Sequence, residues 1–200
     1  MPIVHRYDPP ERFVAGTVGA PGQRTFFLQA RSGVRITSVA LEKQQVLVLA
    51  ERLESLLDDL MQAQGEVLIP AVTPAGSQDS EPLEQPIDEE FRAGTMTLAW
   101  DDDAGRVIIE VFPVEDSIEV TEVDPAEGDA PGVSEVVELE VEEIEPDELL
   151  VVSLPPALAR AFCERAQAVV AAGRPPCQFC GNPLDPAGHL CPRANGFRRR

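Results

Sequence analysis

The sequence predicts an α+β fold of two similar strand-rich halves, which together form one antiparallel-rich sheet with two helices. Each half shows three segments of strand length, apolar or alternating, followed by a longer segment with helical periodicity. Gly, Pro and Asp gather between these segments, where they favour chain reversal. A cysteine-rich tail follows the second half, and its ligand chemistry is considered below.

The first half comprises residues 1–65 and is expected to end in a helix. Leucines recur at intervals of three and four positions through residues 42–64, which predicts one buried stripe along that helix. Gly65 is expected to end it. Strands are expected before it at residues 12–18, 24–31 and 34–40, and the stripe comprises Leu49, Leu53, Leu56, Leu57 and Leu60.

The second half, residues 93–173, is expected to duplicate the first, because Ala93-Gly94-Thr95 repeats Ala15-Gly16-Thr17. Residues 66–92 are rich in Pro, Gly, Ser and acids and predict a linker, with room for a short strand at 66–69. Pro155-Pro156 favours a helix start, since Pro is accepted in the first turn. Strands are expected at 95–100, 106–114 and 148–154, and the helix should bury Leu158, Phe162, Ala166, Val169 and Val170.

The charge is strongly acidic and unevenly distributed. The net charge is -19, which argues against a protein that wraps a nucleic-acid backbone. Residues 115–147 are expected to be an acidic insertion in the second half, in which residues 133–141 form an edge strand or stay disordered. The sign reverses in the tail, residues 174–200, which ends in three arginines.

The composition also indicates where the protein resides. No apolar run reaches the roughly 18 residues of a membrane span. The first residues lack the form of a signal peptide, so we expect a cytoplasmic protein with reduced cysteines.

The tail gathers four metal ligands. Cys177, Cys180, His189 and Cys191 fall within fifteen positions, in the pattern Cys-x-x-Cys-Gly followed by His-x-Cys. Three thiolates and one imidazole are a common tetrahedral set for structural Zn²⁺, with no position open for a catalytic water. The sequence therefore predicts a zinc knuckle in which backbone N–H groups donate to the thiolates.

The same cysteines could instead form a redox motif or a disulfide. A redox Cys-x-x-Cys needs a helix N-terminus, yet Gly-Asn-Pro follows Cys180. A disulfide fits a reducing compartment poorly. Cys163, on the predicted second helix, is expected to be a small core residue, although it could replace His189 as a ligand.

Three further motifs have simple structural interpretations. Gly16, Gly19 and Gly22 suggest a phosphate loop, but the segment leads into a strand, so a hairpin turn is expected. A hairpin turn is also expected at residues 101–105, although the three aspartates could hold a cation. His5 is the one histidine outside the tail and lacks a second histidine as partner, so we expect no catalytic role.

Four stretches of the chain resemble an actinobacterial family of conserved proteins with a domain of unknown function. They are residues 13–19 (FVAGTVG), 22–30 (GQRTFFLQA), 39–43 (VALEK) and the tail from Gly173 to Gly196. The likeness is absent over about residues 114–147. The resemblance implies no activity, but it places the four tail ligands where the family has them. It also implies an association with kinase-like and phosphatase-like proteins, whose genes are neighbours in that family.

These observations favour a non-catalytic cytoplasmic scaffold or adaptor that binds zinc and a protein partner, with no membrane or nucleic-acid partner. One alternative is a nucleic-acid binder that stacks bases on Phe179 and Phe197 and meets phosphates with the tail arginines. Another is an enzyme that acts with the kinase-like and phosphatase-like neighbours. A cleft of convergent polar side chains would favour the enzyme.

Overall fold

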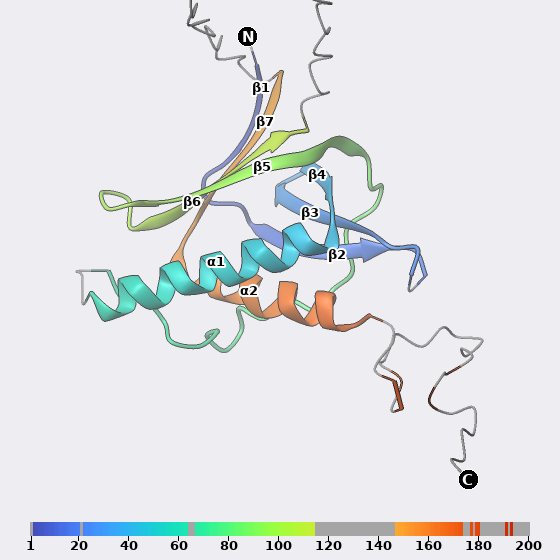
Figure 1. Ribbon diagram of the computed structural model, residues 1–200. Helices are drawn as coiled ribbons and strands as arrows, with labels where there is room; N and C mark the ends of the chain where they lie inside the picture. Colours follow the sequence, from blue (N-terminus) through green and yellow to red (C-terminus); the bar gives the residue numbers. More distant parts are fainter. Residues whose placement is uncertain are drawn as a thin grey trace, which may run out of the picture.

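The computed structural model describes residues 2–20, 22–63, 67–114, 147–173, 177, 179–180, 191 and 193. These residues form two layers, a seven-stranded sheet and two helices that lie side by side against it (Figure 1). The elements are β1 (Ile3–Tyr7), β2 (Arg12–Val18), β3 (Thr25–Ser32), β4 (Arg35–Leu41), α1 (Lys43–Gln62), β5 (Glu89–Asp101), β6 (Arg106–Pro113), β7 (Glu148–Leu154) and α2 (Pro156–Ala171).

The strand order is β1-β7-β6-β5-β4-β3-β2. The α+β prediction is confirmed, but the prediction of an antiparallel-rich sheet is wrong, because the sheet is mixed. β1 pairs parallel with β7, and β4 pairs parallel with β5. A two-residue hairpin can join only antiparallel strands, whereas a parallel pair needs a long crossover connection. The connection from β4 to β5 contains α1 and is long enough to permit the central parallel pair.

Most elements lie where the sequence predicts them. β2 and β7 have the predicted bounds, and Pro155 precedes the first turn of α2 as expected. β5 begins at Glu89, so the last residues of the predicted linker belong to a strand. Residues 67–70 form no strand. β1 was not predicted. Three strands and a helix occur twice in order, but duplication stays a prediction, and residues 115–146 lie outside the described part.

The main core lies between the sheet and the helices. Leu49, Leu53 and Leu57 of α1 are buried as predicted, whereas Leu56 and Leu60 are only partly buried. Phe162 of α2 stacks on Phe13 of β2, with ring centroids 4.8 Å apart. Among the described residues, neither helix combines the length and the apolar character that a membrane crossing requires.

Residues 67–88, here called the strap, lead from α1 to β5 around the β2 edge of the sheet (Figure 1). On the helix side, the Pro70 carbonyl accepts a hydrogen bond of 3.1 Å from Arg160 of α2. On the opposite face, Leu83 packs into a second small core, whose other buried members are Val14, Phe27 and Ala40. The strap therefore covers an edge strand and part of the sheet face that the helices leave open.

Gly16 lies in β2 directly beneath Leu83. A Cβ atom at this position would stand 2.5 Å from Leu83 Cγ, far inside van der Waals contact. The strap can pack this closely only where the strand has no side chain. Gly19 (φ 103°) and Gly22 (φ 97°) lie in the following turn, between antiparallel β2 and β3, so the predicted hairpin is confirmed.

The contact with Leu83 predicts that Gly16→Ala destabilises the protein. We expect a loss of about 1–3 kcal/mol in the free energy of unfolding, because the added methyl overpacks a buried contact. Urea denaturation of Gly16→Ala, Leu83→Ala and the double variant provides a double-mutant cycle. The two changes should compensate in part, and strictly additive effects would contradict this account.

Candidate functional site

Three cysteines of the tail come together beyond the end of α2. The sulfur atoms of Cys177, Cys180 and Cys191 all lie within 4.8 Å of one another. The sulfurs of Cys177 and Cys191 are 3.8 Å apart, and both side chains are buried. The Arg193 side chain donates a 3.4 Å hydrogen bond to the Phe179 carbonyl, so the chain just beyond Cys191 also contacts the Cys177–Cys180 segment. The arrangement could hold a metal ion.

The local backbone favours the thiolate form of Cys177. The Phe179 backbone N–H donates to Cys177 Sγ at 3.4 Å. This hydrogen bond is the main cause that lowers the pKa of Cys177, followed by a second from the Cys180 backbone. Because a metal binds the deprotonated thiol, an environment that stabilises the thiolate also favours metal binding.

The two remaining candidates for a zinc ligand are His189 and Cys163. His189, the predicted fourth ligand, lies outside the described residues. Cys163 is buried in the main core on α2 and is not a member of the cysteine cluster. Burial raises the pKa of its thiol to about 12. The expectation that Cys163 is a core residue is therefore confirmed.

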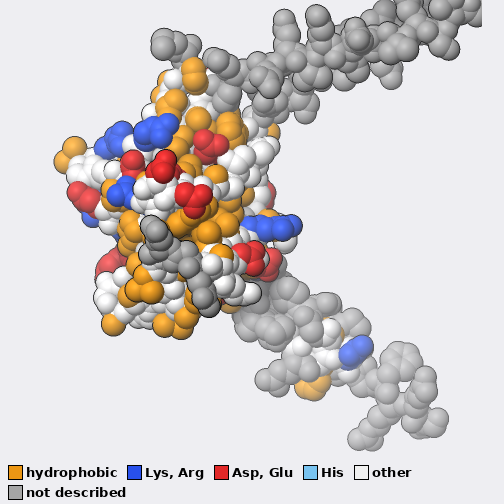
Figure 2. Space-filling view, turned by 90° about the vertical axis from the view of Figure 1, so that its left-hand side faces the viewer, with side chains coloured by type: hydrophobic (Ala, Val, Ile, Leu, Met, Phe, Trp, Pro, Cys, Tyr) orange, Lys and Arg blue, Asp and Glu red, His pale blue; other side chains and the backbone are white. Residues whose placement is uncertain are grey.

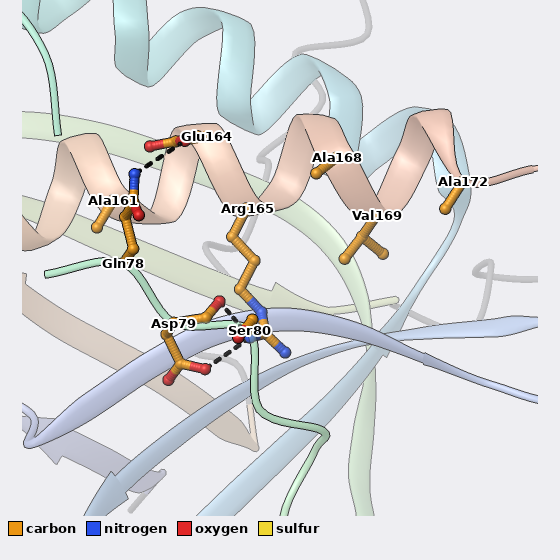
Figure 3. Close-up of a pocket in the computed structure, with 9 residues that line it drawn as sticks. All are labelled: Gln78, Asp79, Ser80, Ala161, Glu164, Arg165, Ala168, Val169 and Ala172. Atoms are coloured by element: carbon orange, nitrogen blue, oxygen red, sulfur yellow. Dashed lines mark hydrogen bonds and ion pairs between the residues drawn. The ribbon is translucent and has the colours of Figure 1, made fainter. Parts of the chain in front are cut away.

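A groove runs along α2 against the strap (Figure 3). Its volume is about 420 Å³. Two pairs of polar side chains in it are bound to each other: Gln78 donates to Glu164 at 3.4 Å, and Arg165 donates to Asp79 Oδ1 at 2.7 Å. The rest of the lining is mostly apolar and comprises Ala161, Ala168, Val169 and Ala172, with Ser80.

Arg165 and Arg12 fasten the strap to the body of the protein. Both side chains are 11% exposed, and both bind the Asp79 carboxylate. Arg165 also donates to the carbonyls of Ala15, Asp79 and Glu81, while Arg12 donates to those of Glu81 and Pro82. Sequence reasoning missed this network, since nothing in a Pro- and Ser-rich segment marks one aspartate as a partner of two distant arginines.

A second group of metal-ligating side chains joins three strands. His5 of β1, Glu90 of β5 and Glu148 of β7 bring one imidazole nitrogen and two carboxylate oxygens within 4.8 Å of one another. Sequence reasoning assigned His5 no catalytic role, because there is no second histidine outside the tail. The signal it missed is the Ile-Val-His-Arg-Tyr segment, in which β-branched and aromatic residues indicate a strand.

The aspartates between β5 and β6 cap a turn, as predicted. Asp101 accepts a 2.9 Å hydrogen bond from the Ala104 backbone N–H, and Asp102 accepts one of 2.7 Å from the Trp100 indole. Gly105 has a φ of 63°, which closes the turn. Within the described part of the chain, these aspartates belong to neither group of candidate metal ligands.

Asp79 predicts a pH dependence of stability. Its hydrogen bonds to Arg12, opposed by burial, lower its pKa below the ordinary value of 3.8. A lowered pKa in the folded state means that the stabilisation is present above about pH 4 and is lost as the pH falls through the folded-state value. Asp79→Asn should therefore reduce the free energy of unfolding by about 1–3 kcal/mol at neutral pH, and by much less near pH 2.

Urea denaturation over this pH range measures the difference between Asp79→Asn and the unchanged protein. Asp103→Asn is the control, because Asp103 is exposed on the hairpin turn and should change stability little at any pH. A gap between Asp79→Asn and the unchanged protein that stays constant from neutral to acid pH would contradict the role given to the carboxylate.

Comparison with known proteins identifies a family but no activity. Residues 5–191 match the family described as Protein of unknown function (DUF3090). No curated protein and no solved structure matches the chain. The family match spans both layers of the fold and reaches the last cysteine of the cluster. The chain belongs to this family of unknown function.

Proposed function

We propose that this protein is a non-catalytic zinc-binding scaffold or adaptor of the cytoplasm. Cys177, Cys180 and Cys191 bind one structural Zn²⁺, with His189 as the fourth ligand. The observation that carries the proposal is the gathering of three thiols within 4.8 Å. His189 stands two positions before Cys191 in the sequence, close enough along the chain to share an ion with it.

The sulfur spacing supports zinc. Two thiolates that each lie about 2.3 Å from one ion, at a tetrahedral angle, are about 3.8 Å apart. Cys177 and Cys191 have this separation, 3.8 Å. A disulfide would bring the sulfurs to about 2.05 Å. Three sulfurs and one nitrogen complete a tetrahedron, so the ion would hold the tail together and leave no position for a reacting water.

The surroundings of the cysteines support a structural role over a redox role. A reactive thiolate in a Cys-x-x-Cys motif is stabilised by a following helix N-terminus. Here Cys177 follows the C-terminal end of α2, and Gly-Asn-Pro, which disfavours a helix start, follows Cys180. The polar pairs in the groove beside α2 are bound to each other, which supports a surface for binding over one for catalysis.

The proposal includes protein partners and a reducing compartment. Thiolate ligands must stay reduced to bind zinc, and this supports a cytoplasmic location. The kinase-like and phosphatase-like proteins implied by the family resemblance are the partners to test first. The coloured part of the face in Figure 2 has few basic side chains, and they lie among acidic and hydrophobic ones, which supports a protein partner over a polyanion.

A nucleic-acid role of the tail is the second candidate. Phe179 is 63% exposed, and its carbonyl accepts a hydrogen bond from Arg193. An exposed aromatic ring beside an arginine can stack on a base while the guanidinium meets a phosphate. The net charge of -19 opposes the approach of a nucleic acid.

The zinc proposal predicts about one zinc ion per chain after purification without chelator, measured by elemental analysis. Cys177→Ser and His189→Ala should lose this ion. Replacement by Co²⁺ should give thiolate-to-cobalt charge-transfer absorption, which reports sulfur ligands alone and should disappear in Cys177→Ser. Cys163→Ala is the matched control and should keep the signal. If Cys163→Ala loses it while His189→Ala keeps it, the ligand set is wrong.

The adaptor proposal predicts that affinity purification from native cells recovers protein partners, whereas binding to single-stranded RNA or DNA is negligible at about 0.15 M salt. Fluorescence anisotropy with labelled oligonucleotides measures the second quantity. Micromolar binding that weakens steeply with salt, and that Phe179→Ala abolishes, would place the nucleic-acid function first.

A further inference from the structure

His5 lies at the rim of the main core, where β1 runs beside β7. It stands two residues before Tyr7, on the same face of the strand, and Tyr7 is buried in that core. The His5 side chain is 17% exposed, and its Nε2 lies 2.6 Å from Glu148 Oε1. Glu90 of β5 brings a second carboxylate to the same point. Three strands distant in sequence thus place three ligand atoms together, open to solvent on one side.

The other nitrogen of His5 faces a hydroxyl. Nδ1 lies 3.3 Å from Thr37 Oγ1, and Thr37 Oγ1 accepts a 2.9 Å hydrogen bond from the buried Tyr7 hydroxyl. Histidines that bind metals commonly donate their second N–H to an oxygen, which fixes the ring orientation. Thr37 can accept this N–H, and Nε2 then presents its lone pair toward Glu148 and Glu90.

The two carboxylates have no arginine or lysine partner within the described residues. Glu148 forms an ion pair only with His5 there, and Glu90 forms none. Two like charges so close repel each other unless a cation neutralises them. The nearby arginines are occupied elsewhere: Arg35 covers the Tyr7 ring at 4.2 Å, and Arg92 pairs with Glu42 and Glu89.

We infer that His5, Glu90 and Glu148 form a binding site for a divalent cation of the Mn²⁺ class, separate from the cysteine cluster. Carboxylate oxygens select hard cations such as Mn²⁺, whereas thiolates select soft ones. The cation replaces the proton that joins His5 Nε2 to Glu148 Oε1. Octahedral ligands about 2.1 Å from an ion lie about 3.0 Å apart, so the present 2.6 Å has to open by a few tenths of an ångström.

Unlike the proposed zinc site, the His5 site leaves coordination positions open on the cation. Three protein ligands on a cation that takes six leave positions for water or for an oxygen ligand such as a carboxylate or phosphate. The two sites therefore differ in donor atoms and in open positions, and the inference stands whether or not the tail binds zinc.

Mn²⁺ binding to the full chain tests the inference, with free Mn²⁺ measured by electron paramagnetic resonance. We expect one tight site per chain. Glu90→Gln should weaken its affinity at least tenfold, and His5→Ala by a similar or larger factor. Glu90 is exposed at the start of β5, so its replacement should leave the fold intact. Glu89→Gln, the neighbouring exposed position with the same change of charge, is the matched control and should bind like the unchanged protein.

The same titration can overturn the inference. If the unchanged protein shows only weak, multiple binding of the kind that any acidic chain gives, the site does not exist. If Glu90→Gln binds Mn²⁺ as tightly as the unchanged protein does, the ion is held elsewhere. Cys177→Ser should bind Mn²⁺ normally, and a loss of the tight site in that variant would assign the ion to the tail.

Discussion

The parallel pairing of β4 with β5 is the constraint on which the rest of the fold depends. It joins two groups of three antiparallel strands into one sheet. Parallel neighbours cannot be joined by a tight turn, so the chain between them must cross over. This crossover contains α1 and the strap, and it carries the chain from the helix face around β2 to the opposite face. The strap contacts follow from this route.

Local sequence patterns were sufficient to predict the positions of most helices and strands. Alternation predicted β2, an apolar segment of strand length predicted β7, and the leucine spacing of α1 identified its buried face. Local sequence patterns could not predict which distant strands pair with each other. β1 has five residues and gains its hydrogen bonds from β7, far along the chain, so no local pattern shows that pairing. The start of β5 was assigned to a linker because acids and prolines precede it.

The two candidate metal sites also differ in how far the sequence alone could predict them. Cys177, Cys180 and Cys191 are close in sequence, so their spacing alone predicted that they meet. The His5 group needs the folded sheet to bring β1, β5 and β7 together, so the sequence alone did not show it. Soft sulfur ligands lie on the tail, whereas hard oxygen ligands lie on the sheet. This separation would let the chain bind two ions at sites of different donor chemistry.

The parallel pairing of β1 with β7 has a consequence for synthesis on the ribosome. The contact between His5 and Glu148 cannot form until Glu148, which lies 143 positions later in the chain, has been synthesised. At about 5–20 residues per second, that interval lasts roughly 7–30 s. Throughout it, β1 lacks the strand with which it pairs, and contacts of such long sequence separation form slowly. The nascent N-terminus would therefore need protection from other strand edges, and completion of the sheet must await the last third of the chain.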